Sequence, residues 1–117
     1  MRQLVIVESE WYRGQGSSSR LMLPDDTKCC LGFDALACGV TKDAILGVTL
    51  PSNISHWWRS SAQEWLWLTH PTDADFDTYE SRISSINDDK YITDKQRKKT
   101  LTALFKEGGD IELVFVP

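Results

Sequence analysis

Residues Thr27–Val40 read TKCCLGFDALACGV and contain all three cysteines of the chain. Asp26 or Thr27 is suited to cap a helix over Lys28–Cys38. On that helix apolar side chains occupy nearly the whole circumference, and Asp34 is the only charged residue beyond the first position. Because a helix that is apolar all round is buried, this stretch predicts the helix around which the core forms.

The cysteines permit three interpretations, namely core packing, a reactive thiol and a metal site. In a buried helix a free cysteine behaves as a small apolar residue. At the helix start, the dipole would lower the thiol pKa of Cys29. A metal site requires paired C-x-x-C or cysteine with clustered histidine, and His56 and His70 are distant and unpatterned. We predict core packing and no metal, with the other two as alternatives.

Short β-branched apolar runs stand near both ends of the chain. Gln3–Val7, QLVIV, is apolar on both faces, which is typical of a central rather than an edge strand. Ile111–Val116, IELVFV, alternates as a second strand, and a shorter one is predicted at Leu21–Leu23. We expect the N- and C-terminal strands to lie side by side, with the cysteine-bearing helix packed on them.

Two further helices are predicted in the C-terminal half. Asp75–Ile86 places apolar residues at helical spacing, with an acidic opposite face. Thr93 and Gln96 form a capping-box pattern at the start of a helix that ends at Gly108. Shorter helical segments are predicted at Lys42–Leu46 and Ser60–Leu68.

The size and composition of the chain indicate one folded domain. Its 117 residues can bury a core without a disulfide or a structural metal. The composition is 41% hydrophobic and 26% charged, as in globular proteins. We therefore predict a single α+β domain over residues 1–117, in which a short sheet is packed by about three helices.

The charge and targeting signals restrict the partners. A net charge of −4 argues against duplex DNA or an anionic membrane as a partner. An acidic segment over 73–89 is followed directly by a basic one over 90–106, so a local patch of either sign can form. We see no signal peptide and no apolar run of about 18 residues, and the odd cysteine count fits a reducing compartment. We expect a cytoplasmic protein.

A loop after the first strand combines two aromatic rings with two cations, and its candidate ligand-binding residues are Trp11, Tyr12, Arg13 and Arg20. An aromatic ring can stack on a nucleobase while a guanidinium binds the phosphate. This combination predicts a nucleotide-like ligand. The alternative is that Trp11 packs back onto the core and Arg13 pairs with Glu8 or Glu10.

Four tryptophans gather between residues 57 and 67, and these candidate partner-binding residues are Trp57, Trp58, Trp65 and Trp67. Tryptophan is enriched at binding hot spots, and a tryptophan-rich segment outside regular structure suits a surface that faces a host protein. The alternative is that these rings complete a small core.

Catalytic signals are weak. Gly14–Ser19 lacks the G-K-[ST] ending of a phosphate-binding loop, and the aspartates of 73–77 depart from the calcium-loop pattern. No nucleophile, base and orienting group stand in a recognisable pattern. We expect a non-enzymatic protein without cofactors. The alternative is a nucleotide hydrolase built on the Glu8–Arg20 loop, in which Glu8 or Glu10 activates water.

Three motifs carry a resemblance to a known group: Trp11-x-Arg13-Gly14, Cys29-Cys30-Leu31-Gly32-Phe33 and Ile86-Asn87-Asp88. Followed by a capped charged helix and a C-terminal strand, they resemble small proteins encoded by tailed phages and prophages. The resemblance covers both ends of the chain and leaves Leu50–Thr72 without a counterpart. The chain departs from the group by placing Asp110 before the final strand.

The resemblance implies a phage accessory protein in the bacterial host cytoplasm and implies no reaction. Such small proteins often act stoichiometrically, either by blocking a host enzyme or defence complex or by sequestering a nucleotide signal. We therefore expect a non-enzymatic protein that binds a host protein, for example one of antiviral defence, or a nucleotide-like signal. The oligomeric state stays open.

Overall fold

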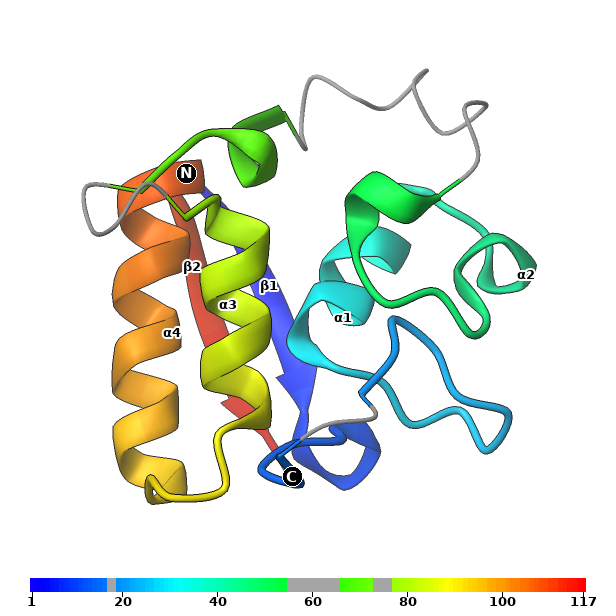
Figure 1. Cartoon of the computed structure of the whole chain (residues 1–117), viewed down its shortest axis with the longest axis horizontal. Coiled ribbons are helices and arrows are strands. Elements are labelled where there is room, and N and C mark those ends of the chain that lie inside the picture. The colour runs from blue at the N-terminus through cyan, green and yellow to red at the C-terminus, as the bar shows by residue number, and fades with distance from the viewer. Residues whose placement is uncertain (17–18, 55–65, 73–76) are drawn as a thin grey trace.

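A computed structural model describes residues 1–16, 19–54, 66–72 and 77–117. Strands β1 (Arg2–Val7) and β2 (Ile111–Val116) come from opposite ends of the chain and form a parallel two-stranded sheet (Figure 1). In the register of this pair Leu4 lies opposite Leu113 and Ile6 opposite Phe115. This arrangement confirms the predicted α+β fold with adjacent terminal strands.

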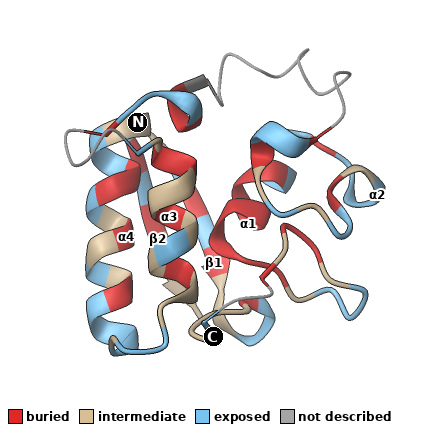
Figure 2. Ribbon diagram, viewed as in Figure 1, coloured by how far each residue is buried: buried red, intermediate tan, exposed pale blue. Residues whose placement is uncertain are grey.

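Helices cover one face of the sheet. The described helices are α1 (Cys30–Ala37), α2 (Lys42–Ile45), α3 (Tyr79–Asp88) and α4 (Asp94–Gly109), with short 3₁₀ turns η1 (Glu8–Glu10), η2 (Pro51–Asn53) and η4 (Leu66–Thr69). Helix α4 packs on β2, α1 packs on β1, and α3 contacts both α1 and α4. Figure 2 shows buried residues on the sides of these elements that face one another. The core therefore lies between the inner face of the sheet and these helices.

The cysteine-bearing helix is buried, as its composition predicts. Cys29, Cys30 and Cys38 are all buried, and a Cβ on Gly32 would collide with the carbonyl oxygen of Leu21. The helix begins at Cys30, later than predicted. The reason is that the backbone of Lys28 forms hydrogen bonds with Glu10 and Tyr12 instead of joining the helix.

The backbone of Lys28 belongs to a short bridge with the loop after β1. Its N–H donates to the carbonyl of Glu10 at 3.0 Å, and its carbonyl accepts from the N–H of Tyr12 at 2.8 Å. An extended residue that pairs in this way cannot also be the first residue of a helix. Cys29 is therefore the N-cap residue in place of Asp26 or Thr27.

Helix α4 confirms the predicted capping box. The Thr93 hydroxyl accepts from the N–H of Gln96 at 3.1 Å, and the Gln96 side chain accepts from the N–H of Thr93 at 2.9 Å. The helix ends at Gly109, and Asp110 follows it with a φ of +52°, so its backbone forms a left-handed cap. This cap explains why Asp110 precedes the strand that begins at Ile111.

Other predicted elements differ from the structure. Leu21–Leu23 is not a strand, because Met22 forms only an isolated bridge with Leu46. Helix α3 starts at Tyr79 behind the N-cap residue Thr78. Most of the predicted Ser60–Leu68 helix lies outside the described residues.

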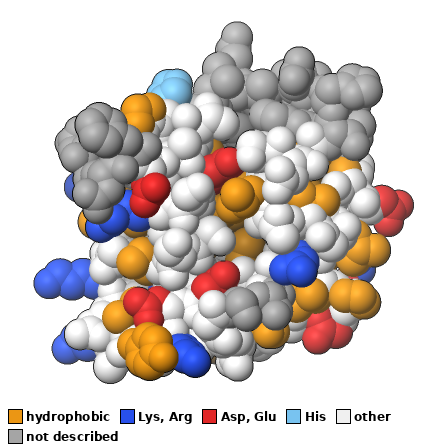
Figure 3. All heavy atoms as spheres, in the orientation of Figure 1, with side chains coloured by type: hydrophobic (Ala, Val, Ile, Leu, Met, Phe, Trp, Pro, Cys, Tyr) orange, Lys and Arg blue, Asp and Glu red, His pale blue; other side chains and the backbone are white. Residues whose placement is uncertain are grey.

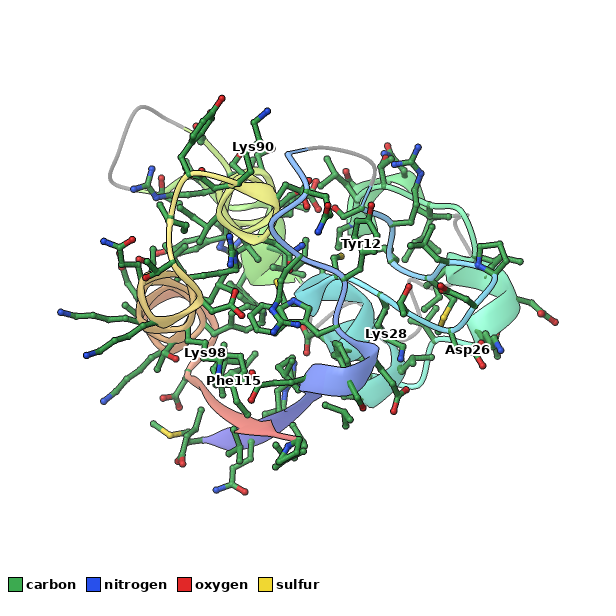
Figure 4. All side chains as sticks on the ribbon, turned by 90° about the horizontal axis from the view of Figure 1, so that it is seen from below. Tyr12, Asp26, Lys28, Lys90, Lys98 and Phe115 are labelled. Atoms are coloured by element: carbon green, nitrogen blue, oxygen red, sulfur yellow. The ribbon has the colours of Figure 1, made fainter. Side chains whose placement is uncertain are left out.

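The prediction that β1 is a central strand is wrong. The sheet of the described residues has two strands, so each strand is an edge. Figure 4 shows the helices on one side of the sheet only. Val5, on the opposite side, is 47% exposed. Although β1 is apolar on both faces, the described helices therefore cover only one of them.

Candidate functional site

Residues 11–16 of the predicted Glu8–Arg20 ligand loop are fastened to the turn between α3 and α4. The N–H of Gly14 donates to the carbonyl of Asn87 at 2.8 Å, and that of Gly16 donates to the carbonyl of Asp88 at 2.6 Å. Trp11 forms a bridge with Lys28 on the other side of the loop. These backbone bonds anchor the loop on both sides.

Trp11 packs on the core, which agrees with the alternative to a nucleotide-binding loop given above. Its side chain is 4% exposed, and its indole Nε1–H donates to Oδ1 of Asn87 at 2.7 Å. The ring lies 5.4 Å from that of Phe115, and the guanidinium of Arg13 lies 4.4 Å from its centroid. The indole is therefore not accessible to a nucleobase in this structure.

Asn87 joins the loop to two helices and is itself fully buried. Its Oδ1 accepts from Trp11 and, at 3.1 Å, from the N–H of Cys30. Its Nδ2 donates to the carbonyl of Tyr12 and to the Asp88 carboxylate, each at 3.1 Å. Sequence reasoning missed this role, although Asn87 belongs to one of the motifs that carry the resemblance.

Arg13 and Arg97 share one carboxylate. Arg13 donates to Oδ2 of Asp94 at 2.8 Å and pairs with Glu8 at 3.8 Å, whereas Arg97 donates to the other oxygen, Oδ1 of Asp94. The hydrogen bond from Arg13 lowers the pKa of Asp94 below its usual value. Asp94 is therefore ionised at neutral pH and is a poor proton acceptor.

A pocket of about 420 Å³ lies between this loop and the start of α4. Trp11, Tyr12 and Arg13 line it, whereas Arg20 is not among its lining residues. Arg20 donates to the carbonyl of Ser19 at 2.9 Å. The structure thus brings together three of the four predicted ligand-binding residues.

The lining of this pocket carries more cations than carboxylates. Its cations are Arg13, Lys90 and Arg97, and its carboxylate is Asp94. Lys90 also lines a second hollow of about 460 Å³, together with Asp88 and Asp89. Because Arg13 and Arg97 already pair with Asp94, an anionic ligand would have to compete with that carboxylate for both guanidinium groups.

Of the four candidate partner-binding tryptophans, Trp67 lies in the core. It is 9% exposed, and its ring meets those of Tyr79 and Phe105 edge-on at centroid distances of 5.5 and 5.4 Å. A Cβ on Gly108 or Gly109 would lie within 2.7 Å of that ring, so the helix backbone packs directly against it. Trp57, Trp58 and Trp65 lie outside the described residues.

The thiols are buried, and the carboxylates of the loop form ion pairs. Burial raises the pKa of Cys29 to about 11, so the helix dipole does not produce a reactive thiol there. Glu8 pairs with Lys98 at 2.7 Å and Glu10 with Lys28 at 3.0 Å. In the described parts of the chain no group of three or more His, Cys, Asp or Glu residues could hold a metal ion.

One side of the sheet faces away from the described helices and is partly exposed. We call it the outer face, and its residues are Gln3, Val5, Glu112, Val114 and Val116. Gln3, Val5 and Glu112 are exposed, and the remaining valines are half-buried. Outside their shared ladder, Gln3–Val7 and Ile111–Val116 form no backbone hydrogen bond with any described residue. Within the described ranges, both strand edges therefore lack a backbone partner, and the outer face is partly exposed.

Comparison of the chain with protein-family models, with curated proteins and with solved structures finds no match. Within the described ranges, no helix is both long enough and apolar enough to cross a membrane. The local geometry is therefore the basis for a functional proposal.

Proposed function

We propose that this protein is a non-enzymatic, phage-type accessory protein that blocks a host protein by binding it through the outer face of the sheet. The observation that carries this proposal is that Val5, Val114 and Val116 stand on a sheet face that none of the described helices covers. Parallel strands are normally covered on both faces, and exposed apolar patches mark interaction sites. Burying the exposed half of Val5 alone would contribute about 1 kcal/mol to binding.

The geometry supports a protein partner better than a nucleotide-like signal. The indole of Trp11 is buried beneath Arg13, and the charges of Arg13 and Arg97 are both directed at Asp94. A nucleotide would have to displace these contacts before it could stack or bind its phosphate. The same pairing leaves the hydrolase alternative without an available base in this loop, because Glu8 and Glu10 also form ion pairs.

A capture experiment with matched variants tests the proposal. Val5 and Leu46 are both 47% exposed, but Leu46 follows α2, away from the sheet. Tagged wild-type protein, Val5→Glu and Leu46→Glu are incubated with bacterial lysate, and bound proteins are identified by mass spectrometry. We expect a host protein that wild type and Leu46→Glu retain and that folded Val5→Glu loses. Equal capture by all three proteins would contradict the proposal.

A nucleotide panel tests the alternative directly. A ligand at about 100 times its Kd adds about 2.7 kcal/mol to stability and raises the melting temperature measurably. We expect no melting shift with mononucleotides, cyclic nucleotides or ADP-ribose. A shift that Arg13→Ala abolishes would favour signal sequestration, and recovery of a cleaved nucleotide would favour the hydrolase.

A further inference from the structure

Each of the two strands has one edge without a backbone partner among the described residues, and helix α4 borders only the edge of β2. Helix α4 packs on β2 (Figure 1). On that side Lys98 reaches the sheet, with its ammonium 5.3 Å from the ring of Phe115 (Figure 4). The edge of β1 instead lies on the side of α1, where Arg2 pairs with buried Asp34 at 2.7 Å. The two edges therefore have different chemical surroundings.

Three exposed lysines form a ridge along α4, and we call Lys95, Lys99 and Lys106 the lysine ridge. Their spacing of four and seven residues places them on one side of the helix. Contact with α3 lies on another side, where Tyr79 donates to Glu107 at 3.1 Å. Figure 3 shows Lys and Arg side chains projecting along the α4 margin of the molecule.

The lysine ridge is available to a partner. None of its three ammonium groups forms a salt bridge with a described residue, whereas neighbouring Lys98 pairs with Glu8 at 2.7 Å. The buried side of α4 carries Leu101, Leu104 and Phe105, so the exposed ridge faces outward on a helix that packs on β2. A strand edge and a row of cations, neither of which has a partner among the described residues, thus belong to two elements that pack on each other.

We infer that an extended segment of the host protein adds to the sheet as a third strand along β2, with alternating acidic and β-branched residues. This inference rests on the proposed function and names the partner's chemistry. Successive side chains of an added strand point to opposite faces of the sheet. One set would extend the valines of the outer face, and the other would place carboxylates toward the lysine ridge. Backbone hydrogen bonds along the edge supply the pairing.

A second copy of the chain fits this edge poorly. Symmetric pairing of two β2 strands would place the two α4 helices side by side on the same face of the joined sheet. Their lysine ridges would then oppose each other, and like charges at close range disfavour association. The charge of the ridge therefore selects an acidic strand from another protein.

Peptide titration followed by NMR tests the inference without the host protein. The ¹⁵N-labelled chain is titrated with a soluble peptide that alternates valine and glutamate, and with one that alternates valine and lysine. We expect the glutamate peptide to bind at least tenfold more tightly. It should shift the amides of Ile111–Val116, newly protect those that are not already bonded to β1, and leave the protection of Arg2–Val7 unchanged. The combined change Lys95→Glu, Lys99→Glu and Lys106→Glu should reverse the preference, and Lys42→Glu on α2 should not change it.

Three results would overturn the inference: equal binding of both peptides, protection confined to β1, or no shift at millimolar peptide. Self-association that protects the β2 amides would also overturn it, since a second copy would then occupy the edge. The two proposals fail separately in the capture experiment. If capture requires Val5 but tolerates reversal of the lysine ridge, the host protein covers the outer face without adding a strand, and only this inference fails.

Discussion

Asn87→Ala should destabilise the fold strongly, because two buried groups and one half-buried group would lose their partner. The indole N–H of Trp11, the N–H of Cys30 and the carbonyl of Tyr12 all bond to the Asn87 side chain at 2.7–3.1 Å. A buried polar group that is left unsatisfied costs about 1–3 kcal/mol, and partial access of water lowers the sum. We expect a loss of about 3–5 kcal/mol, a large share of the roughly 5–15 kcal/mol of a typical domain.

The assay is urea unfolding followed by far-ultraviolet circular dichroism, with two comparison variants. Asn53→Ala removes an exposed asparagine whose side chain donates to the Thr49 hydroxyl at 2.8 Å and to no other described residue, and it should change stability by less than about 0.5 kcal/mol. Asn87→Asp keeps the acceptor for Trp11, loses the donor to Tyr12 and places a second carboxylate beside that of Asp88. Its cost should therefore also exceed that of Asn53→Ala.

Hydrogen exchange of the Trp11 indole N–H provides the decisive readout. In the wild type this proton should exchange slowly, because it is buried and bonded to Asn87. If Asn87→Ala costs no more than Asn53→Ala and the indole proton already exchanges rapidly in the wild type, Asn87 does not anchor the loop. The loop would then be free to serve as the nucleotide site, and our reasoning against that function would be refuted.

Three further predictions concern the same region and the core. Gly14→Ala should lower the free energy of unfolding in urea by about 1–3 kcal/mol. Gly14 has a φ of +72°, and the added Cβ would lie 3.0 Å from Arg97 Nη2. No measurable loss of stability would contradict this prediction. Native Cys29 should react slowly with iodoacetamide in intact-mass measurements, since burial raises its pKa to about 11, and rapid labelling would contradict its placement. Asp94→Asn should destabilise the protein at neutral pH but much less in acid. Because the pKa of Asp94 is lowered in the fold, its carboxylate stabilises the protein at pH values above the unfolded pKa of about 3.9. This contribution is lost as the pH falls through the lowered pKa of the folded state. A difference between wild type and Asp94→Asn that stays constant with pH would contradict that assignment.

Elements that depend on neighbouring residues could be predicted from the sequence. The capping box of Thr93 and Gln96 involves residues three positions apart, and α4 begins where it indicates. The terminal strands likewise follow from runs of β-branched residues. The start of α1 could not be predicted, because it depends on the pairing of Lys28 with Glu10 and Tyr12.

The role of the loop after β1 could not be predicted from local sequence either. Trp11 and Arg13 have the composition of a nucleotide site, and only their partners decide between binding and packing. Those partners are Asn87 and Asp94, which follow 76 and 81 positions later in the chain. No local pattern connects such distant residues. From sequence alone, a loop in which Trp11 and Arg13 stabilise the fold therefore looks the same as a loop in which they bind a ligand.

The wrong prediction for β1 has a different origin, because here the local pattern and the fold disagree. QLVIV carries apolar residues on both faces, as strands do that are covered on both sides. The structure covers Leu4 and Ile6 with helices and leaves Val5 47% exposed. Conflicts between local pattern and overall fold concentrate at functional sites. A bound host protein would give the outer face the covering that its sequence specifies, so this disagreement itself argues that the sheet is a binding surface.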